Sequence, residues 1–324
     1  MRILVWHVHG SWMTAFVQGA HEYLVPVVPG RGPDGRGLAR TYPWPGTVRE
    51  VSPQQLAAEC IDVVVLQRMQ ELELVRRWTG CRPGVDLPAL YVEHNTPRGD
   101  VADWRHPLAD DDRIPLVHVT DFNAAMWENG RAPVRVIEHG VPDPGYRWTG
   151  ERTTLAVCVN EPVRRWRVAG MDLAARIARE VPIEVYGIGA AQLPGRIGTG
   201  LAAVHEDLPQ AQLHEDLARH RAYLHPFRWT SLGLALVEAM MLGLPVLALA
   251  STAAPDAVTP GAGLVSADVG ELARLARRLV RDPELAAQLG RTGRRYAIER
   301  FGLPRFLADW DAALSAVSAR WTVR

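Results

Sequence analysis

The chain has 324 residues, of which 48% are apolar, and its 36 basic and 36 acidic side chains leave no formal net charge. Balanced charge gives no global field favouring nucleic acid or an anionic membrane, and the length suits two domains of about 150 residues each. The 36 basic residues are all arginine. Any cation that binds phosphate must therefore be an arginine or a protonated histidine.

The three cysteines, Cys60, Cys81 and Cys158, are scattered and lack the spacing of metal ligands. We therefore expect no disulfide framework. The N-terminus enters an apolar strand pattern directly, without the layout of a signal peptide. No apolar run approaches the roughly 18 residues that a membrane span needs. These features predict a cytoplasmic protein and leave room for peripheral membrane contact.

In the first half of the chain, short apolar strands alternate with amphipathic helices. Strands rich in valine, isoleucine and leucine that are separated by helices indicate a parallel sheet covered on both faces. The predicted strands are 3–8, 24–28, 61–66, 89–93, 116–120 and 134–138, and the predicted helices are 12–21, 53–59, 71–78 and 122–129.

A long insertion at residues 29–47 is rich in glycine, proline and arginine. It contains Gly-Arg-Gly-Pro-Asp-Gly from Gly30 to Gly35, a formal match to the dinucleotide-binding fingerprint. That fingerprint requires a following helix to receive the pyrophosphate, whereas Arg-Gly-Leu-Ala-Arg-Thr-Tyr-Pro-Trp-Pro follows here. We expect a flexible loop instead, suited to a lid on the acceptor side of a two-domain enzyme, and hydride transfer loses its support.

Residues 142–152 interrupt the alternation with two prolines and two glycines, which predicts an interdomain linker. The pattern then restarts, so we expect two doubly wound domains facing each other across a cleft, with ligands beyond the carboxyl ends of the strands. The predicted domains are 1–147 and 148–302, and a C-terminal helix at 303–324 can pack back on the first. The predicted strands are 155–159, 183–186, 222–224, 246–249 and 263–265, and the predicted helices are 171–180, 210–219, 232–242, 269–281, 283–301 and 304–318.

Residues 225–246 carry the densest chemical information. A short strand ends near His225, a loop follows, and a helix begins near Leu232 and ends at Gly243. A loop that enters a helix N-terminus offers unpaired N–H groups and a positive dipole end, which suits a diphosphate. Glu238 lies one to two turns into that helix, where a carboxylate can accept hydrogen bonds from two adjacent ribose hydroxyls.

This segment resembles the signature of glycosyltransferase family 4, retaining enzymes of the GT-B fold that include the phosphatidylinositol mannosyltransferases. The resemblance extends along nearly the whole chain, through Gly10 after the first strand, Glu93-His94-Asn95, His139-Gly140-Val141, Tyr186-Gly-Ile-Gly189 and the closing 289–301 segment. The residues of the signature that fit are Pro226, Ser231, Gly233, Glu238, Ala239, Met240, Gly243, Pro245 and Val246.

The resemblance implies two facing Rossmann-like domains and the transfer of a sugar from a nucleoside diphosphate sugar to a hydroxyl acceptor with retention of configuration. No metal or other cofactor is implied for the chemistry. The implied acceptor is a small molecule, a lipid-linked sugar or a natural product, lying against the N-terminal domain. The implied catalytic residues are His94, Thr230 and Glu238, and the implied donor-binding residues are Gly10, Ser11, Arg164, Arg165, Arg167, Gly187, Gly189, Ser231, Leu232, Gly233, Leu234 and Glu238.

Two departures from the family pattern leave alternatives open. Thr230 stands where the family has its first glutamate, which contacts a hydroxyl of the transferred sugar. The family's arginine and lysine for the diphosphate are also missing, and the candidates to replace them are Arg164, Arg165 and Arg167. The chain could therefore be a non-catalytic relative that only binds a nucleotide sugar, or a sugar-nucleotide epimerase of the same fold.

Two further patterns favour structure over chemistry. Asp110-Asp111-Asp112 mimics the Asp-x-Asp metal motif of the other large glycosyltransferase fold, but its polar surroundings predict a solvated acidic turn. Four tryptophans fall in predicted loops, where either stacking on sugar rings or ordinary packing accounts for them. They are Trp44, Trp148, Trp166 and Trp229.

Overall fold

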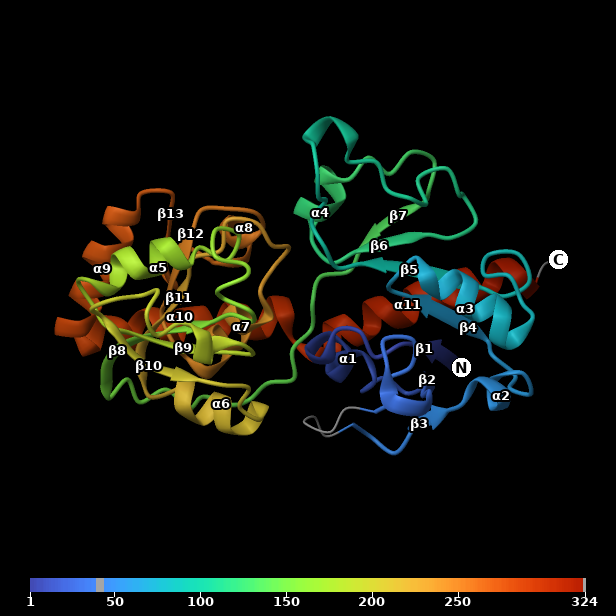
Figure 1. Ribbon diagram of the computed structural model, residues 1–324, viewed down its shortest axis with the longest axis horizontal. Coiled ribbons are helices and arrows are strands. Elements are labelled where there is room, and N and C mark those ends of the chain that lie inside the picture. The colour runs from blue at the N-terminus through green and yellow to red at the C-terminus, as the bar shows by residue number, and fades with distance from the viewer. Residues whose placement is uncertain (39–43, 323–324) are drawn as a thin grey trace. The chain divides into compact units, whose positions relative to one another are not determined.

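The computed structural model describes residues 1–38 and 44–322. The chain divides into two compact units, the first made of Met1–Gly140 and Leu303–Arg324 and the second of Val141–Gly302. Each unit is a parallel sheet with helices packed on it (Figure 1). Residues 142–152, expected to form a linker, lie in the second unit, whose first strand begins at Arg152.

The sheet of the first unit has seven parallel strands in the order β3-β2-β1-β4-β5-β6-β7. The strands are β1 (Arg2–Val5), β2 (Glu22–Pro26), β3 (Val48–Val51), β4 (Val63–Leu66), β5 (Ala89–Glu93), β6 (Leu116–His118) and β7 (Val134–Val136). The α-helices are α1 (Gly10–Phe16), α2 (Pro53–Leu56), α3 (Gln70–Thr79), α4 (Asp121–Met126) and α11 (Leu303–Thr322).

The sheet of the second unit has six parallel strands in the order β10-β9-β8-β11-β12-β13. Both sheets follow the Rossmann order, in which the chain moves outward from a central strand and then returns to that strand's other side. The strands are β8 (Arg152–Cys158), β9 (Ile183–Tyr186), β10 (Leu201–His205), β11 (His220–His225), β12 (Val246–Leu249) and β13 (Gly263–Ser266). The α-helices are α5 (Met171–Ala178), α6 (Gln210–Leu217), α7 (Leu234–Leu242), α8 (Ala254–Ala257), α9 (Val269–Arg281) and α10 (Pro283–Phe301).

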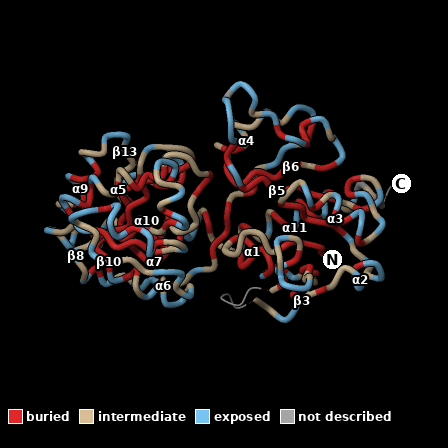
Figure 2. Tube along the Cα trace, viewed as in Figure 1, coloured by how far each residue is buried: buried red, intermediate tan, exposed pale blue. Residues whose placement is uncertain are grey.

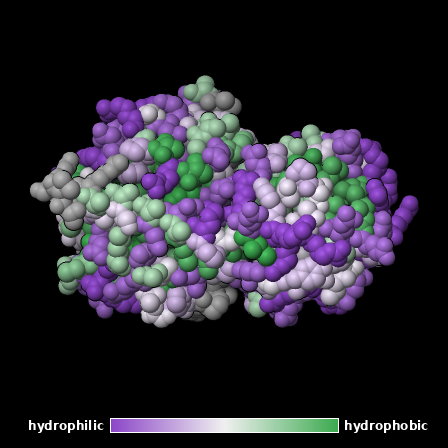
Figure 3. Space-filling model, turned by 180° about the vertical axis from the view of Figure 1, so that it is seen from behind, coloured by the Kyte–Doolittle hydropathy of each residue, from purple (hydrophilic) through white to green (hydrophobic). Residues whose placement is uncertain are grey.

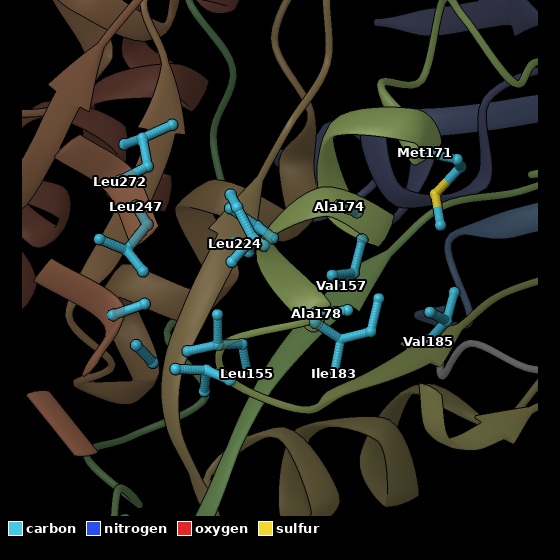
Figure 4. Close-up of a cluster of buried hydrophobic side chains, with 14 of the residues drawn as sticks. Leu155, Val157, Met171, Ala174, Ala178, Ile183, Val185, Leu224, Leu247 and Leu272 are labelled. Atoms are coloured by element: carbon cyan, nitrogen blue, oxygen red, sulfur yellow. The ribbon is translucent and has the colours of Figure 1, made fainter. Parts of the chain in front are cut away.

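The cores lie between the sheets and their helices, and central strands such as β1, β4 and β11 are among the most deeply buried parts of the two units (Figure 2). In the first unit α11 contributes Trp310, whose ring packs edge-on against Trp12 at 5.6 Å and Phe16 at 4.9 Å between centroids. In the second unit strand residues such as Leu155 and Val157 meet α5 and α9 in one buried cluster (Figure 4). Burying these aromatic and aliphatic side chains is the main stabilising contribution in each unit.

Several predicted elements differ from the observed ones. Two strands, β3 and β10, and the one-turn helix α8 were not expected. The predicted first strand ran to Val8, but β1 ends at Val5, since its parallel pairing with β4 ends at Val65. Residues 6–9 therefore leave the sheet edge as a loop.

The described part of the 29–47 insertion is a loop, as expected, and it makes hydrogen bonds to the rest of the first unit. A 3₁₀ turn at Pro29–Arg31 is followed by an antiparallel bridge between Val27 and Arg36, not by an α-helix. The Arg31 guanidinium donates to Glu50, and Trp44 Nε1 donates to Thr14 Oγ1 at 3.0 Å. Residues 39–43 lie outside the described residues, and a lid role stays a prediction.

Figure 3 shows hydrophilic residues over much of the visible face of each unit, with smaller hydrophobic patches among them. Among the described residues, none of the helices combines the length and the apolar character needed to cross a membrane.

Candidate functional site

The central strands β8 and β11 of the second unit are where the strand order reverses, which is where doubly wound sheets bind ligands. The chain leaves β8 through residues 159–170 and leaves β11 through residues 226–233. Gly170 brings the two loops together. Its φ is +69°, and a Cβ there would lie 1.8 Å from the carbonyl oxygen of Pro226. Only glycine allows both this conformation and this approach.

The second loop enters the N-terminus of α7, which is an anion-binding element. Gly233 is the N-cap and no side chain caps the helix. The first N–H groups of an α-helix have no intrahelical acceptor. The positive end of the helix dipole adds to their attraction for a negatively charged ligand.

Two buried polar atoms beside this helix start lack a hydrogen-bond partner. They are Ser231 Oγ and His225 Nδ1, on residues that are 5% and 2% exposed. A Cβ on Gly233 would lie 2.7 Å from His225 Cε1, so the histidine ring packs directly beneath the N-cap. Burial lowers the pKa of His225 to about 4, so the ring is neutral at pH 7. Most buried polar atoms in proteins are hydrogen-bonded, so these two atoms beside a helix N-terminus are candidate contacts for a ligand.

The arginines after β8 have different surroundings. Arg164 is ion-paired with Glu161, and Arg167 with Asp172 at 2.7 Å. Arg165 instead stacks on Phe227 in the second loop, with its guanidinium carbon 5.7 Å from the ring centroid. Of the three predicted diphosphate ligands, Arg165 is therefore the one whose guanidinium packs on the second loop.

Arg228 is a cation in this region that the sequence analysis did not single out. It donates to both carboxylate oxygens of Asp172, at 2.6 and 2.8 Å, and to the Arg167 carbonyl. Its place in the loop that leads to α7, two residues after Pro226, could have identified it as a candidate cation for the site. The paired Asp172 holds Arg228 firmly, and the Arg228 guanidinium lowers the pKa of Asp172.

Glu238 lies in the second turn of α7 and is only 5% exposed. Its Oε1 accepts from Gln210 Nε2 at 3.1 Å, and its Oε2 lies 3.5 Å from His214 Nε2. Gln210 and His214 are one turn apart on α6, so that helix holds the carboxylate. The sequence placed neither residue near Glu238, because a contact between two helices leaves no pattern in a single sequence.

Other predicted donor-binding residues lie at the same sheet edge. Gly187 and Gly189 follow β9, with φ angles of +139° and +78°. Two N–H groups of this turn are already hydrogen-bonded within the protein, because the Glu206 carboxylate accepts from Gly189 at 2.6 Å and from Ala191 at 2.9 Å. Thr230 is half-buried in the loop before α7, Leu232 is buried beside Gly233, and Leu234 begins the helix.

The remaining predicted residues belong to the first unit. Gly10 and Ser11 begin α1. His94 follows β5 and is 9% exposed, with its ring centroid 5.0 Å from that of Trp12. Burial lowers the pKa of His94 well below the ordinary histidine value. Each unit thus holds predicted residues at the carboxyl edge of its own sheet.

A separate polar cluster lies beside α6, near the starts of β8 and β11. Arg152 donates to Glu184 at 3.1 Å and to Asp216 at 2.6 Å, and the Tyr186 hydroxyl donates to Asp216 at 2.6 Å. Among described residues, Glu184, Asp216 and His220 are close enough together to hold a metal ion. Arg152 is already ion-paired with both carboxylates, which argues for an ion-pair network there.

The aspartate run at 110–112 and two of the four loop tryptophans make contacts within the protein. Asp110 pairs with Arg105, and Asp111 with Arg113. Trp148 packs on the core of the second unit and donates to the His220 carbonyl at 2.9 Å. Trp166 packs on the same core under the Arg196 guanidinium, 4.8 Å from its ring centroid. Trp148 and Trp166 are therefore packing residues.

Part of the second unit matches a known protein family. Residues 203–296 match the family model described as glycosyl transferases group 1. A GDP-mannose-dependent phosphatidylinositol monomannoside mannosyltransferase of Corynebacterium glutamicum is 43% identical over 65 residues, which are 19% of this chain and 17% of that protein. A trehalose synthase of Rubrobacter xylanophilus is 34% identical over 77 residues, 24% of this chain and 18% of that protein. The matches thus span less than a fifth of each curated relative.

Solved structures resemble the chain over nearly its whole length. Sucrose-phosphate synthase from Thermosynechococcus elongatus has a TM-score of 0.76 at 13% identity, covering 99% of this chain and 100% of that one. HepE of Anabaena, in complex with UDP and glucose, has a TM-score of 0.71 at 15% identity, covering 98% and 100%. The second unit thus contains a segment that matches the glycosyl transferases group 1 family, and the two parallel-sheet units have the fold of GT-B glycosyltransferases.

Proposed function

We propose that this chain transfers a sugar from a nucleoside diphosphate sugar to a hydroxyl group of an acceptor, with retention of configuration. The observation that carries the proposal is the uncapped N-terminus of α7 beside the unpartnered Ser231 hydroxyl, with Glu238 one turn further on. The match of residues 203–296 to the group 1 family supports it. HepE, which shares the fold, was solved with UDP and glucose.

The chemistry follows from the charges at the site. When the sugar leaves, negative charge grows on the diphosphate, and fixed positive groups lower the barrier. In this chain the N–H groups of α7 and the Arg165 guanidinium would supply the positive charge that stabilises the diphosphate. We therefore propose that the transfer needs no metal ion. Glu238 would accept hydrogen bonds from the two ribose hydroxyls and orient the nucleotide.

We further propose that Thr230 contacts a hydroxyl of the transferred sugar. A threonine offers one neutral hydrogen bond where a glutamate would offer a charged one, which is a difference of about 1 kcal/mol. Thr230→Val removes this one neutral hydrogen bond. It should leave the Kd of the free nucleotide unchanged, because the free nucleotide has no sugar to contact, and raise the KM of the nucleotide sugar about five- to tenfold.

The first test is calorimetric titration of the full chain with UDP, GDP, UDP-glucose and GDP-mannose, with and without EDTA. The proposal expects one nucleotide to bind with micromolar affinity, and Glu238→Ala to weaken it at least 30-fold, roughly 2 kcal/mol. Glu299→Ala, which removes an exposed carboxylate of α10, is the matched control and should bind like the wild type.

Arg165→Gln and Arg164→Gln form a second matched pair. The first should weaken the diphosphate roughly tenfold or more, while the second removes a surface ion pair and should change little. If no nucleotide binds at millimolar concentration, the proposal is wrong. Binding without slow donor hydrolysis would favour a non-catalytic relative, and conversion of the sugar on the nucleotide would favour an epimerase.

A further inference from the structure

A groove runs along one face of α10 in the second unit. Its volume is about 630 Å³, which is within the range of small-molecule sites. One wall is α10 itself, where the residues at 288, 291, 295 and 298 follow helical spacing and form a continuous stripe. The other wall is Tyr146, in the loop before β8.

Close packing holds both walls of the groove in place. α10 packs along α7 (Figure 1), and a Cβ on Gly290 would lie 1.9 Å from the carbonyl oxygen of Gly243. A Cβ on Gly243, the C-cap of α7, would lie 2.4 Å from Tyr146 Cε2. The tyrosine ring therefore rests on the C-terminal end of α7, and the groove is formed before any ligand binds.

The groove has an excess of positive charge. Three arginines line it, and none of the described residues that line it is acidic. Arg294 has a structural partner, because it donates to both carboxylate oxygens of Asp143, at 2.7 and 2.8 Å. Arg291 and Arg295 are exposed, and neither makes an ion pair within residues 1–38 and 44–322. Like charges four residues apart on a helix repel each other, so a bound anion would relieve this repulsion.

Apolar surface lies next to these charges. Six large hydrophobic side chains are exposed among the described residues, and two of the six line this groove. They are Tyr146, which is 46% exposed, and Ile298, which is 40% exposed. A tyrosine ring offers a flat face for the body of a ligand. Guanidinium groups beside exposed apolar side chains match a molecule that has an anionic group and an organic body.

We propose that this groove binds a phosphate ester, with its phosphate group between Arg291 and Arg295 and its organic body against Tyr146 and Ile298. Phosphate oxygens accept the paired hydrogen bonds that guanidinium groups donate. A free phosphate ester and the headgroup of a phospholipid both present this chemistry. The groove lies at the C-terminal end of α7, about 13 Å along this nine-residue helix from its N-terminus. It is thus separate from the nucleotide site, and the proposal does not rest on the proposed function.

The test is calorimetric titration of the full chain with phenyl phosphate, with a short-chain phosphatidylglycerol below its micelle concentration, and with inorganic phosphate. Physiological ionic strength screens unspecific attraction to the surface. At least one ester should bind with a Kd below about 1 mM, and at least about fivefold more tightly than inorganic phosphate, because its body adds apolar contact. Tighter binding of phenyl phosphate identifies a free ester as the ligand, and tighter binding of the lipid identifies a headgroup.

Matched variants locate the binding site. Arg291→Gln and Arg295→Gln should each weaken the ester about three- to tenfold. Arg176→Gln, which removes an exposed arginine of α5, is the control and should bind like the wild type. Ile298→Ser should reduce the advantage of the ester over inorganic phosphate while leaving inorganic phosphate unchanged. Thermal unfolding of each variant establishes that it folds.

A further variant separates this groove from the nucleotide site. Arg165→Gln should bind the ester like the wild type, whether or not the chain binds a nucleotide, and excess UDP should not displace the ester. The proposal is overturned if no ester binds the folded chain, or if the Arg291→Gln and Arg295→Gln double variant binds it like the wild type. It is also overturned if UDP displaces the ester, or if the esters bind no more tightly than inorganic phosphate.

Discussion

Replacing Glu238 by glutamine should change nucleotide binding and stability in opposite directions. The carboxylate is 5% exposed and has one hydrogen-bond donor in the described chain, Gln210, with His214 at 3.5 Å. Burying a charge with so little compensation is costly, so the neutral amide should raise the free energy of unfolding by about 1 kcal/mol. For a unit of this size, that is a melting temperature about 2–4 °C higher.

Nucleotide affinity should fall in the same variant. Charge-assisted hydrogen bonds contribute about 1 kcal/mol more than neutral ones, and we propose two of them to the ribose. The expected loss is about 2 kcal/mol, or roughly 30-fold in Kd. Differential scanning calorimetry without ligand and isothermal titration with the nucleotide measure the two effects. An unchanged Kd would refute the ribose role, and a lower melting temperature would refute the argument that burying this carboxylate costs stability.

Three further predictions concern the second unit. Arg221 is buried and donates to the carbonyls of Gly150, Leu279 and Val280, so Arg221→Met should lower the free energy of unfolding in urea by about 3 kcal/mol. Arg219→Met removes an exposed ion pair and should lower it by under about 1 kcal/mol; equal losses would contradict the burial argument. Gly170→Ala combines a φ of +69° with a collision at Pro226, and should lower the melting temperature and the diphosphate affinity more than Gly195→Ala, where φ is +98° and nothing lies within 4 Å. Burial lowers the pKa of His220 to about 4, below its unfolded value near 6.5. The folded chain therefore binds this proton more weakly than the unfolded chain. The contribution of neutral His220 to stability is present above pH 6.5 and is lost as the pH falls toward 4, by up to about 1.4 kcal/mol per pH unit. Urea unfolding at pH 7 and pH 5 should show this loss of stability, and His220→Gln should make the loss smaller.

The sequence predicted the architecture of both units because their strands are buried on both faces. Uninterrupted apolar runs such as Val246–Leu249 have no other stable place in a folded chain. The bounds of α9 and α10 were predicted correctly since Asp268 and Asp282 cap their first turns and Pro283 begins the second helix. The edge strands β3 and β10 were missed, because an edge strand carries polar or half-buried residues that weaken its pattern.

The sequence predicted the candidate site only where its residues are contiguous in the chain. The loop from His225 and the helix that follows it are contiguous in the chain, so their chemistry could be predicted from their order. The choice of Arg165 over Arg164 depends on Phe227, more than sixty residues away in the chain. Which strand ends lie side by side depends on the order of the strands in each sheet, which the local sequence pattern does not encode.

The short helix α6 belongs to two neighbourhoods at once. One side carries Gln210 and His214 to the carboxylate of Glu238, and another carries Asp216 to the Arg152 network. A rigid helix cannot shift toward one partner without moving away from, or into, the other. A substitution that shifts α6 should therefore change both the position of the Glu238 carboxylate and the ion pairs of Arg152.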